Sequence, residues 1–234
     1  MNAALAERLS RLSTPHVTDG CLKARVPVRC APAGLRPLTA GMRCAGRARP
    51  AGHAGSVDIF LEALERATPG EVLVVDNGGR LDEACVGDLV TLEVKMAGLG
   101  GIVIWGLHRD TAEIVDIGLP FFSLGAMSTG PLRLDRRSPD SLDRVAVGTC
   151  TVGPDDVVIG DADGVIFVSN ERLAEVIDAA ETVRASERRQ ADAMRRGQSL
   201  RALTSFNQYL ARRAVDPAYG FREHLRSIGG AVEE

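Results

Sequence analysis

The fold is decided by residues 87–110, which read GDLVTLEVKMAGLGGIVIWGLHRD. The apolar residues in this stretch predict one helix over Leu89–Ala97 and one short buried strand over Gly101–Trp105. A helix, a turn and a strand of these lengths bring the two ends of the stretch back near each other. We therefore expect Asp88 to lie close to the Arg109-Asp110 pair.

The flanking residues continue the alternation of strands and helices. An apolar strand over Glu71–Asp76 follows a helix that Ser56 is expected to cap. On the other side, a short helix over Thr111–Val115 leads to a strand at Pro120–Leu124. Strands that alternate with helices are typical of parallel pairing, so the sequence predicts an α/β core.

Residues 145–168 follow a different pattern, with short strands joined by tight turns. Val145–Val147, Val157–Ile159 and Val165–Val168 are apolar, and the last two flank the sequence Gly160-Asp161-Ala162-Asp163-Gly164. Asp-Gly is a strong tight-turn signal. We expect these strands to pair antiparallel.

The N-terminal part of the chain carries weaker signals. Leucines at positions 5, 9 and 12 predict a helix that stops near Pro15. Thr18-Asp19-Gly20 fits either a turn or the start of a second helix. A weak strand is expected over Met42–Arg47.

The C-terminal part is expected to be helical. Asn170 is a suitable cap for a long helix that runs to Arg196 and ends at Gly197. Residues 200–234 show further helical signal. We expect a single domain over residues 1–199, followed by a helical tail over 200–234 that packs on the domain or on a neighbouring subunit.

Composition narrows the class of protein. The chain has 234 residues, 45% of them hydrophobic, and a net charge of −3, which offers no general footprint for nucleic acid. No N-terminal leader and no apolar run of membrane-spanning length is visible, so we expect no membrane association and a cytoplasmic location. The five cysteines show no metal-binding spacing and are expected to be reduced, buried thiols.

The chemistry of the stretch 87–110 suggests a binding site for an anion and a metal. Gly87 precedes a helix start, where unpaired amides and the helix dipole favour a carboxylate. Arg109 can grip a carboxylate or enolate oxygen through its two-pronged guanidinium. Asp110 is suited to Mg²⁺ or Mn²⁺ as a hard oxygen ligand, and Asp88 to hold a water. A surface salt bridge between Arg109 and either carboxylate explains the same residues without any site.

A longer succession of motifs gives the stretch a context. In order, the chain contains Asp76-x-Gly-Gly, Gly87-Asp88-Leu89-Val90, Gly98-x-Gly-Gly-Ile-Val-Ile, Gly106-x-x-Arg109-Asp110, Gly118-x-Pro120 and Gly160-Asp161-x-Asp163-Gly164-Val165. This succession resembles the RraA-like family, which includes the class II pyruvate aldolases of 4-hydroxy-4-methyl-2-oxoglutarate and 4-carboxy-4-hydroxy-2-oxoadipate. The resemblance covers roughly residues 56–168.

The resemblance implies a fold, an assembly and a site. The fold is a swivelling β/β/α core, phosphohistidine-domain-like, with helical N- and C-terminal extensions. The assembly is a homotrimer or a dimer of trimers (a homohexamer) with sites at subunit interfaces. The residues matching Gly87, Asp88, Leu89 and Val90 bind the pyruvate carboxylate, and those matching Arg109 and Asp110 contact the keto oxygen and the divalent metal.

The implied reaction is a metal-assisted retro-aldol cleavage of a 4-hydroxy-2-oxo acid to pyruvate and a second oxo acid. A water positioned by Asp88 takes the proton from the 4-hydroxyl, helped by a glutamate of a neighbouring subunit. Glu187 is the best match for that glutamate by its place in the chain, with Glu171, Glu175 and Glu181 as competitors. Decarboxylation of oxaloacetate is expected to accompany the cleavage, whereas mid-helix Lys95 disfavours a Schiff-base route.

Other interpretations remain at this stage. Part of the family binds and inhibits a ribonuclease, so a non-catalytic regulator is the alternative function. A methyltransferase is rejected, because no glycine-rich strand-to-helix loop for adenosylmethionine is present. His108 fits either a contact to the distal part of the substrate or a hydrogen-bonded loop residue. His16, His53 and His224 are read as structural or surface residues, of which His53 is the first to reconsider.

Overall fold

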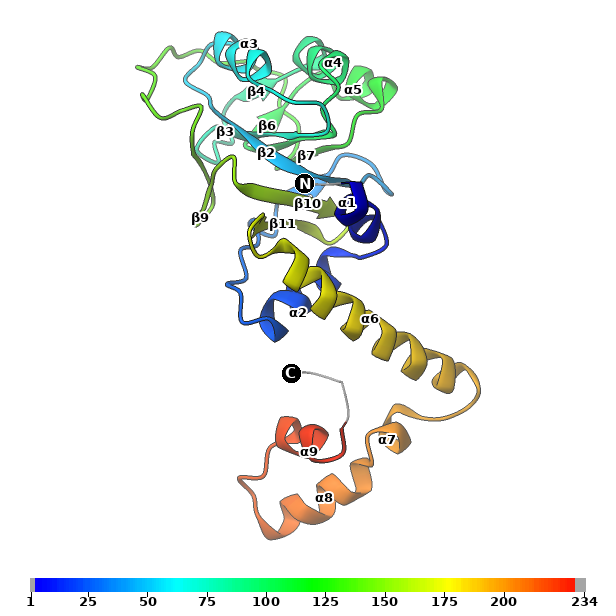
Figure 1. Cartoon of the computed structure of the whole chain (residues 1–234). Coiled ribbons are helices and arrows are strands. Elements are labelled where there is room, and N and C mark those ends of the chain that lie inside the picture. The colour runs from blue at the N-terminus through cyan, green and yellow to red at the C-terminus, as the bar shows by residue number, and fades with distance from the viewer. Residues whose placement is uncertain (1–2, 230–234) are drawn as a thin grey trace.

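A seven-stranded mixed sheet forms the centre of the molecule (Figure 1). The computed structural model describes residues 3–229, so the ends of the expected first helix and tail, residues 1–2 and 230–234, lie outside it. The strands lie in the order β1 (Arg36–Pro37), β7 (Phe121–Ser123), β5 (Gly101–Trp105), β3 (Val72–Asp76), β2 (Cys44–Gly52), β10 (Asp156–Asp161) and β11 (Gly164–Ser169).

The two pairing modes expected from the sequence both occur. Strands β2, β3, β5 and β7 are parallel neighbours, and their apolar residues, such as Val74 paired with Val103, are buried on both faces of the sheet. Strands β10 and β11 form the expected antiparallel hairpin, closed where Asp161 faces Gly164. Two small pairs lie outside the sheet, β4 (Ala84–Val86) with β6 (Leu107–His108), and β8 (Val145–Val147) with β9 (Cys150–Val152).

Three short helices lie together above the parallel part of the sheet (Figure 1). They are α3 (Asp58–Glu65), α4 (Asp88–Met96) and α5 (Thr111–Ile117). Each buries an apolar side chain in one core cluster with the parallel strands, namely Phe60, Val94 and Ile114. The prediction that Ser56 caps the first of them is wrong: the N-cap residue is Val57, and no side chain caps the helix.

The terminal helices pack at the other end of the sheet. Helices α1 (Ala3–Ser10), α2 (Thr14–Lys23) and α6 (Leu173–Arg195) bury their apolar faces with β10 and β11. Thr18-Asp19-Gly20 lies in the middle of α2 and is neither a turn nor a helix start. The N-cap of α6 is Arg172 rather than Asn170, whereas Gly197, with φ at +95°, follows the end of α6 as expected.

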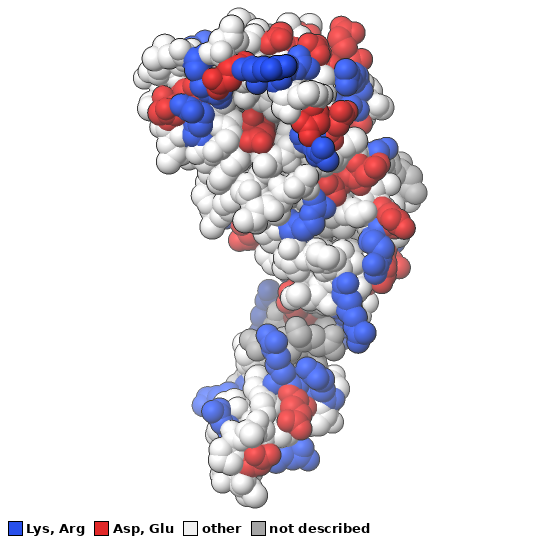
Figure 2. All heavy atoms as spheres, turned by 90° about the vertical axis from the view of Figure 1, so that its left-hand side faces the viewer, with Lys and Arg blue, Asp and Glu red and all other residues white. Residues whose placement is uncertain are grey.

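The rest of the described tail forms a separate helical cluster beyond the end of α6 (Figure 1). It consists of α7 (Leu200–Leu203), α8 (Phe206–Val215) and α9 (Phe221–Ser227). Its aromatic side chains pack on one another, with Tyr209 at the centre and the His224 ring 5.7 Å away. Figure 2 shows more basic than acidic side chains on this segment. The division into a domain at 1–199 and a tail stays a prediction.

Two further expectations concern membranes and thiols. Within residues 3–229, no helix is both long and apolar enough to cross a membrane. All five cysteines are free, and four of them are buried as expected, but Cys30 is exposed. Burial raises the pKa of the Cys44 thiol to about 12 and that of Cys21 to about 11, which keeps both in the protonated, unreactive form.

Candidate functional site

The candidate site begins with the backbone of Asp110, which joins β6 to α5. Asp110 has φ of 61° and ψ of 45°, the left-handed conformation that aspartate tolerates better than most residues. This bend directs the carboxylate toward the start of α4, where Asp110 Oδ2 lies 3.4 Å from the backbone nitrogen of Asp88. The two ends of the stretch 87–110 therefore meet, as the sequence predicted.

Gly87 makes this close approach possible. A Cβ atom added at Gly87 would lie 2.3 Å from Asp110 Oδ2, well inside van der Waals contact. The backbone of Gly87, with φ of −127°, is open to any residue. Glycine is needed here for space rather than for backbone freedom.

Arg109 completes the cluster. Its Nε lies 3.4 Å from Asp110 Oδ2, and the Arg109 side chain is 51% exposed. The ion pair of the alternative interpretation is thus present in the free chain. It is nevertheless part of a cavity wall, because Gly87, Asp88, Leu89, Val90, Arg109 and Asp110 line one cavity of about 310 Å³. This volume is in the range of small-molecule sites.

The oxygen donors in this cavity fit a divalent cation such as Mg²⁺ or Mn²⁺. Such ions take one or two protein carboxylates and retain several waters. Asp110 supplies a partly exposed carboxylate, and Asp88 a second one in the same cavity. No group of three or more histidines, cysteines or acids among residues 3–229 is arranged to hold a metal. Asp110 would hold such a cation directly and Asp88 through a water, with the other ligands supplied by water, substrate or a neighbouring subunit.

None of the glutamates expected from a neighbouring subunit lines this cavity in its own chain. Glu187 lies on α6, where its carboxylate is 3.1 Å from Nε2 of His16. Glu175 pairs with Arg172, and Glu181 with Arg8, while Glu171 is exposed before the helix. Their contribution to another subunit's site stays a prediction.

His108 occupies a structural position. Its Nδ1 is 2.8 Å from the Ser123 hydroxyl, and its Nε2 is 3.0 Å from the Thr111 hydroxyl. The ring is 2% exposed and meets Phe121 edge-on. Burial lowers the pKa of His108. Both nitrogens are engaged with the protein, which agrees with the loop interpretation and leaves neither free for a substrate.

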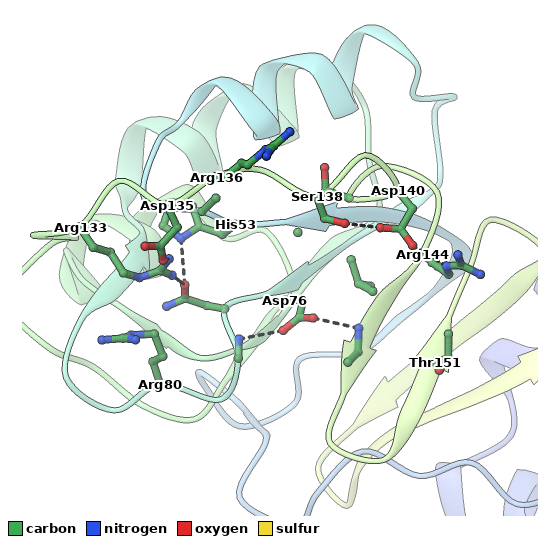
Figure 3. A pocket seen from close by; sticks show the side chains of 17 residues that line it. His53, Asp76, Arg80, Arg133, Asp135, Arg136, Ser138, Asp140, Arg144 and Thr151 are labelled. Atoms are coloured by element: carbon green, nitrogen blue, oxygen red, sulfur yellow. Dashed lines mark hydrogen bonds and ion pairs between the residues drawn. The ribbon is translucent and has the colours of Figure 1, made fainter.

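A second cavity adjoins the first and was not anticipated from the sequence. It measures about 640 Å³, and Figure 3 shows Asp76 at its floor, His53, Arg133 and Asp135 at one end, and Asp140 and Arg144 at the other. Asp76 could have been found from its place at the end of a parallel strand. Arg133 contacts Asn77 across 56 positions of the chain, a separation that no local pattern reveals.

Comparison with known proteins shows which family the chain resembles. The family model described as RraA-like, Aldolase/RraA, matches residues 14–167. The chain is 36% identical over 155 residues to a Cupriavidus necator protein named "Putative 4-hydroxy-4-methyl-2-oxoglutarate aldolase", covering 62% of this chain and 90% of that protein. It is 28% identical over 175 residues to Protein DlpA of Legionella pneumophila, covering 71% of this chain but only 28% of DlpA.

A solved structure gives the same result. Streptomyces coelicolor RraAS2, described as an unusual member of the RNase ES inhibitor RraA protein family, matches with a TM-score of 0.68 at 25% identity. The match covers 83% of this chain and 98% of that one. It confirms the expected fold class, an α/β core of the swivelling β/β/α type with helical extensions at both ends.

The family match runs from the first residue of α2 into β11, and so includes both ends of the stretch 87–110. It spans more than half of the chain, and the structural likeness agrees with it. The chain belongs to the RraA-like (Aldolase/RraA) family.

Proposed function

We propose that this protein is a divalent-metal-dependent class II pyruvate aldolase, which cleaves a 4-hydroxy-2-oxo acid to pyruvate and a second oxo acid. One observation carries the proposal: the left-handed backbone of Asp110 brings its carboxylate to the start of α4, in one cavity with Arg109. The Cupriavidus relative bears the name of such an aldolase, which supports the same chemistry.

The start of α4 binds the substrate carboxylate. Its amides already point at carboxylate oxygens in the free chain, Asp88 N at Asp110 Oδ2 and Leu89 N at Asp88 Oδ1, 2.8 Å away. The positive end of the helix dipole adds to this attraction. The backbone of residues 87–90 thus holds the pyruvate half of the substrate, and Gly87 lets it come close to the chain.

Arg109 acts where charge develops. As the bond between C3 and C4 breaks, its electron pair moves toward the keto oxygen, which becomes negative. The partly exposed guanidinium can reach that oxygen and stabilise the charge more strongly in the transition state than in the substrate. A divalent cation held by Asp110 would supply further positive charge beside the substrate's carboxylate and keto oxygens.

Proton transfers complete the reaction. The 4-hydroxyl loses a proton, and C3 of the departing pyruvate gains one. A water held by Asp88 lies beside the pyruvate half of the substrate and takes part in these proton transfers. Lys95 lies in the last turn of α4, and its ammonium donates to the carbonyl of Ile117 at the end of α5. Lys95 therefore takes no part in the reaction. Oxaloacetate is a second substrate, since its loss of CO₂ places the same charge on the keto oxygen.

The test is a screen of 4-hydroxy-2-oxo acids and oxaloacetate for pyruvate release with and without Mg²⁺. We expect release that EDTA abolishes and added Mg²⁺ restores. Arg109→Ala should lower turnover by about 100-fold or more, as removal of a transition-state donor does. Release that is equally fast in EDTA, or in Arg109→Ala, would contradict the proposal.

A second candidate function is supported by the likeness to RraAS2, whose description names an RNase inhibitor family. In that case the chain is a regulator that binds a ribonuclease through its surface and needs no metal. The same screen separates the two functions. Absence of pyruvate from every oxo acid, together with inhibition of a purified RNase E-type ribonuclease, would favour the regulator.

A further inference from the structure

His53 forms part of the wall between the two cavities. It lines both the cavity of Asp88, Arg109 and Asp110 and the larger one shown in Figure 3. The side chain is 8% exposed, and its ring is stacked parallel to Phe60 at a centroid distance of 5.4 Å. The imidazole is therefore held in a fixed plane beside the candidate site.

Hydrogen bonding fixes which nitrogen of His53 carries the proton. Arg133 Nη2 donates to Asn77 Oδ1 over 2.9 Å, and a guanidinium can only donate, so this atom of Asn77 is the oxygen. His53 Nδ1 lies 2.9 Å from the same oxygen and must donate to it. In the neutral ring, Nε2 then carries the lone pair.

The Nε2 atom is open to a cavity. It has no hydrogen-bond partner among residues 3–229 and does not belong to the buried, unpartnered side-chain atoms there, which are Asn77 Nδ2 and Arg80 Nε. Protein atoms therefore do not fully enclose Nε2.

The surroundings keep the ring neutral. Burial lowers the pKa of His53 below its ordinary value of 6.5, and the hydrogen bond to Asn77 acts in the opposite direction. Among the nearby charges, Arg133 lowers the pKa further, whereas Glu83 and Asp58 raise it. Since the net shift is downward, the imidazole is unprotonated at pH 7 and able to accept a proton.

We propose that His53 Nε2 is the base that accepts the 4-hydroxyl proton of the substrate in this chain. The proposal rests on the proposed function. As the O–H bond breaks, its electrons form the carbonyl of the second oxo acid, and the C3–C4 electron pair moves into the pyruvate enolate. Nε2 holds the released proton as imidazolium and returns it to solvent through the cavity. The water on Asp88 supplies the proton that C3 gains, so protons balance.

This assignment divides the proton transfers between two residues that line one cavity, His53 and Asp88. The family resemblance instead implies that the water on Asp88 takes the 4-hydroxyl proton. The ordinary pKa of an imidazole lies above that of a carboxylate, and a general base works best when its pKa is near the working pH. The split also predicts a difference between substrates, because decarboxylation of oxaloacetate removes no hydroxyl proton.

The test compares two reactions in His53→Gln, with Mg²⁺ present throughout. Aldol cleavage should lose about 100-fold or more in kcat, the usual contribution of a general base, while oxaloacetate decarboxylation changes by less than about threefold. A parallel fall of both reactions would mean that His53 is merely structural, and unchanged cleavage would also overturn the inference. Failure of the wild type to release pyruvate from either substrate would instead overturn the proposed function.

A second variant and a spectroscopic readout make the test independent of folding defects. Asn77→Asp places a carboxylate at Nδ1, stabilises the imidazolium and should shift the acid limb of kcat for cleavage to higher pH. In the wild type, ¹⁵N chemical shifts assigned with His53→Gln should show the Nδ1–H tautomer at pH 7.5. An Nε2–H tautomer, or an acid limb that does not move, would contradict the inference.

Discussion

Asp110 illustrates how much of the site depends on single residues. Its left-handed backbone and the missing side chain at Gly87 together create the contact between its carboxylate and the start of α4. The pattern of glycine, aspartate and arginine predicted that these residues meet, but not the backbone conformation that brings them together.

Gly87→Ala tests this contact. The new methyl group would overlap Asp110 Oδ2 and must displace the carboxylate from its place beside Arg109. We expect kcat/KM for pyruvate release to fall by about 100-fold, as small misplacements at reacting centres do. Gly153→Ala is the matched control, because its added Cβ would meet only ordinary contact at 3.5 Å. Equal activity of the two variants would show that the contact is unimportant.

The packing of α2 explains why Thr18-Asp19-Gly20 forms neither the turn nor the helix start expected from the sequence. Gly20 looks like a turn residue, yet it lies inside α2 where that helix crosses α6. A Cβ at Gly20 would be 2.6 Å from the carbonyl oxygen of Val176. The glycine serves a close helix–helix approach, which depends on a residue more than 150 positions away and is invisible in local sequence.

The apolar elements were easier to predict than their ends. Strands β3 and β5 and helix α4 were found because burial imposes a periodic pattern on a run of residues. Ser56 and Asn170 were wrong as caps because a cap requires a particular backbone geometry, which residue type only favours. The two-residue strand β6 was missed, since a pair so short carries no period.

Asp161 links two of these elements. At the end of β10, its carboxylate accepts hydrogen bonds from Thr14 N at 2.7 Å and Thr14 Oγ1 at 2.6 Å, at the start of α2. Asp161→Ala removes both acceptors in a buried place and should lower the free energy of unfolding by about 2 kcal/mol in urea titrations.

The control for this prediction is Asp155→Ala. The Asp155 carboxylate is 95% exposed and pairs with Arg47 at the surface, so its loss should cost less than about 0.5 kcal/mol. If both variants were equally stable, the link between β10 and α2 would not contribute to stability.

The number of chains that form the site is a prediction for the whole molecule. Within residues 3–229, no group of three or more histidines, cysteines or acids is arranged to hold a metal, and Glu187 pairs with His16 of its own chain. We therefore keep the prediction of a homotrimer or a dimer of trimers, in which a glutamate such as Glu187 reaches a neighbour's cavity. Light scattering should give a mass three or six times that of one chain.

Subunit mixing tests the shared site. Glu187→Gln and Asp110→Ala should each be inactive alone, because one lacks the neighbour's glutamate and the other the metal ligand. After joint unfolding and refolding, mixed assemblies contain some sites with both native residues and should regain activity. If mixing restores nothing while each variant forms the native assembly, Glu187 belongs to no neighbouring site.

In the proposed function, metal-dependent release of pyruvate in this cavity depends on Asp110. The most direct measurement is the rate of pyruvate release in Mg²⁺ by the wild type, Asp110→Ala and the control Asp116→Ala, whose carboxylate is exposed on α5. We predict that Asp110→Ala abolishes release while Asp116→Ala matches the wild type. Release by Asp110→Ala at the wild-type rate would contradict the proposed role of Asp110.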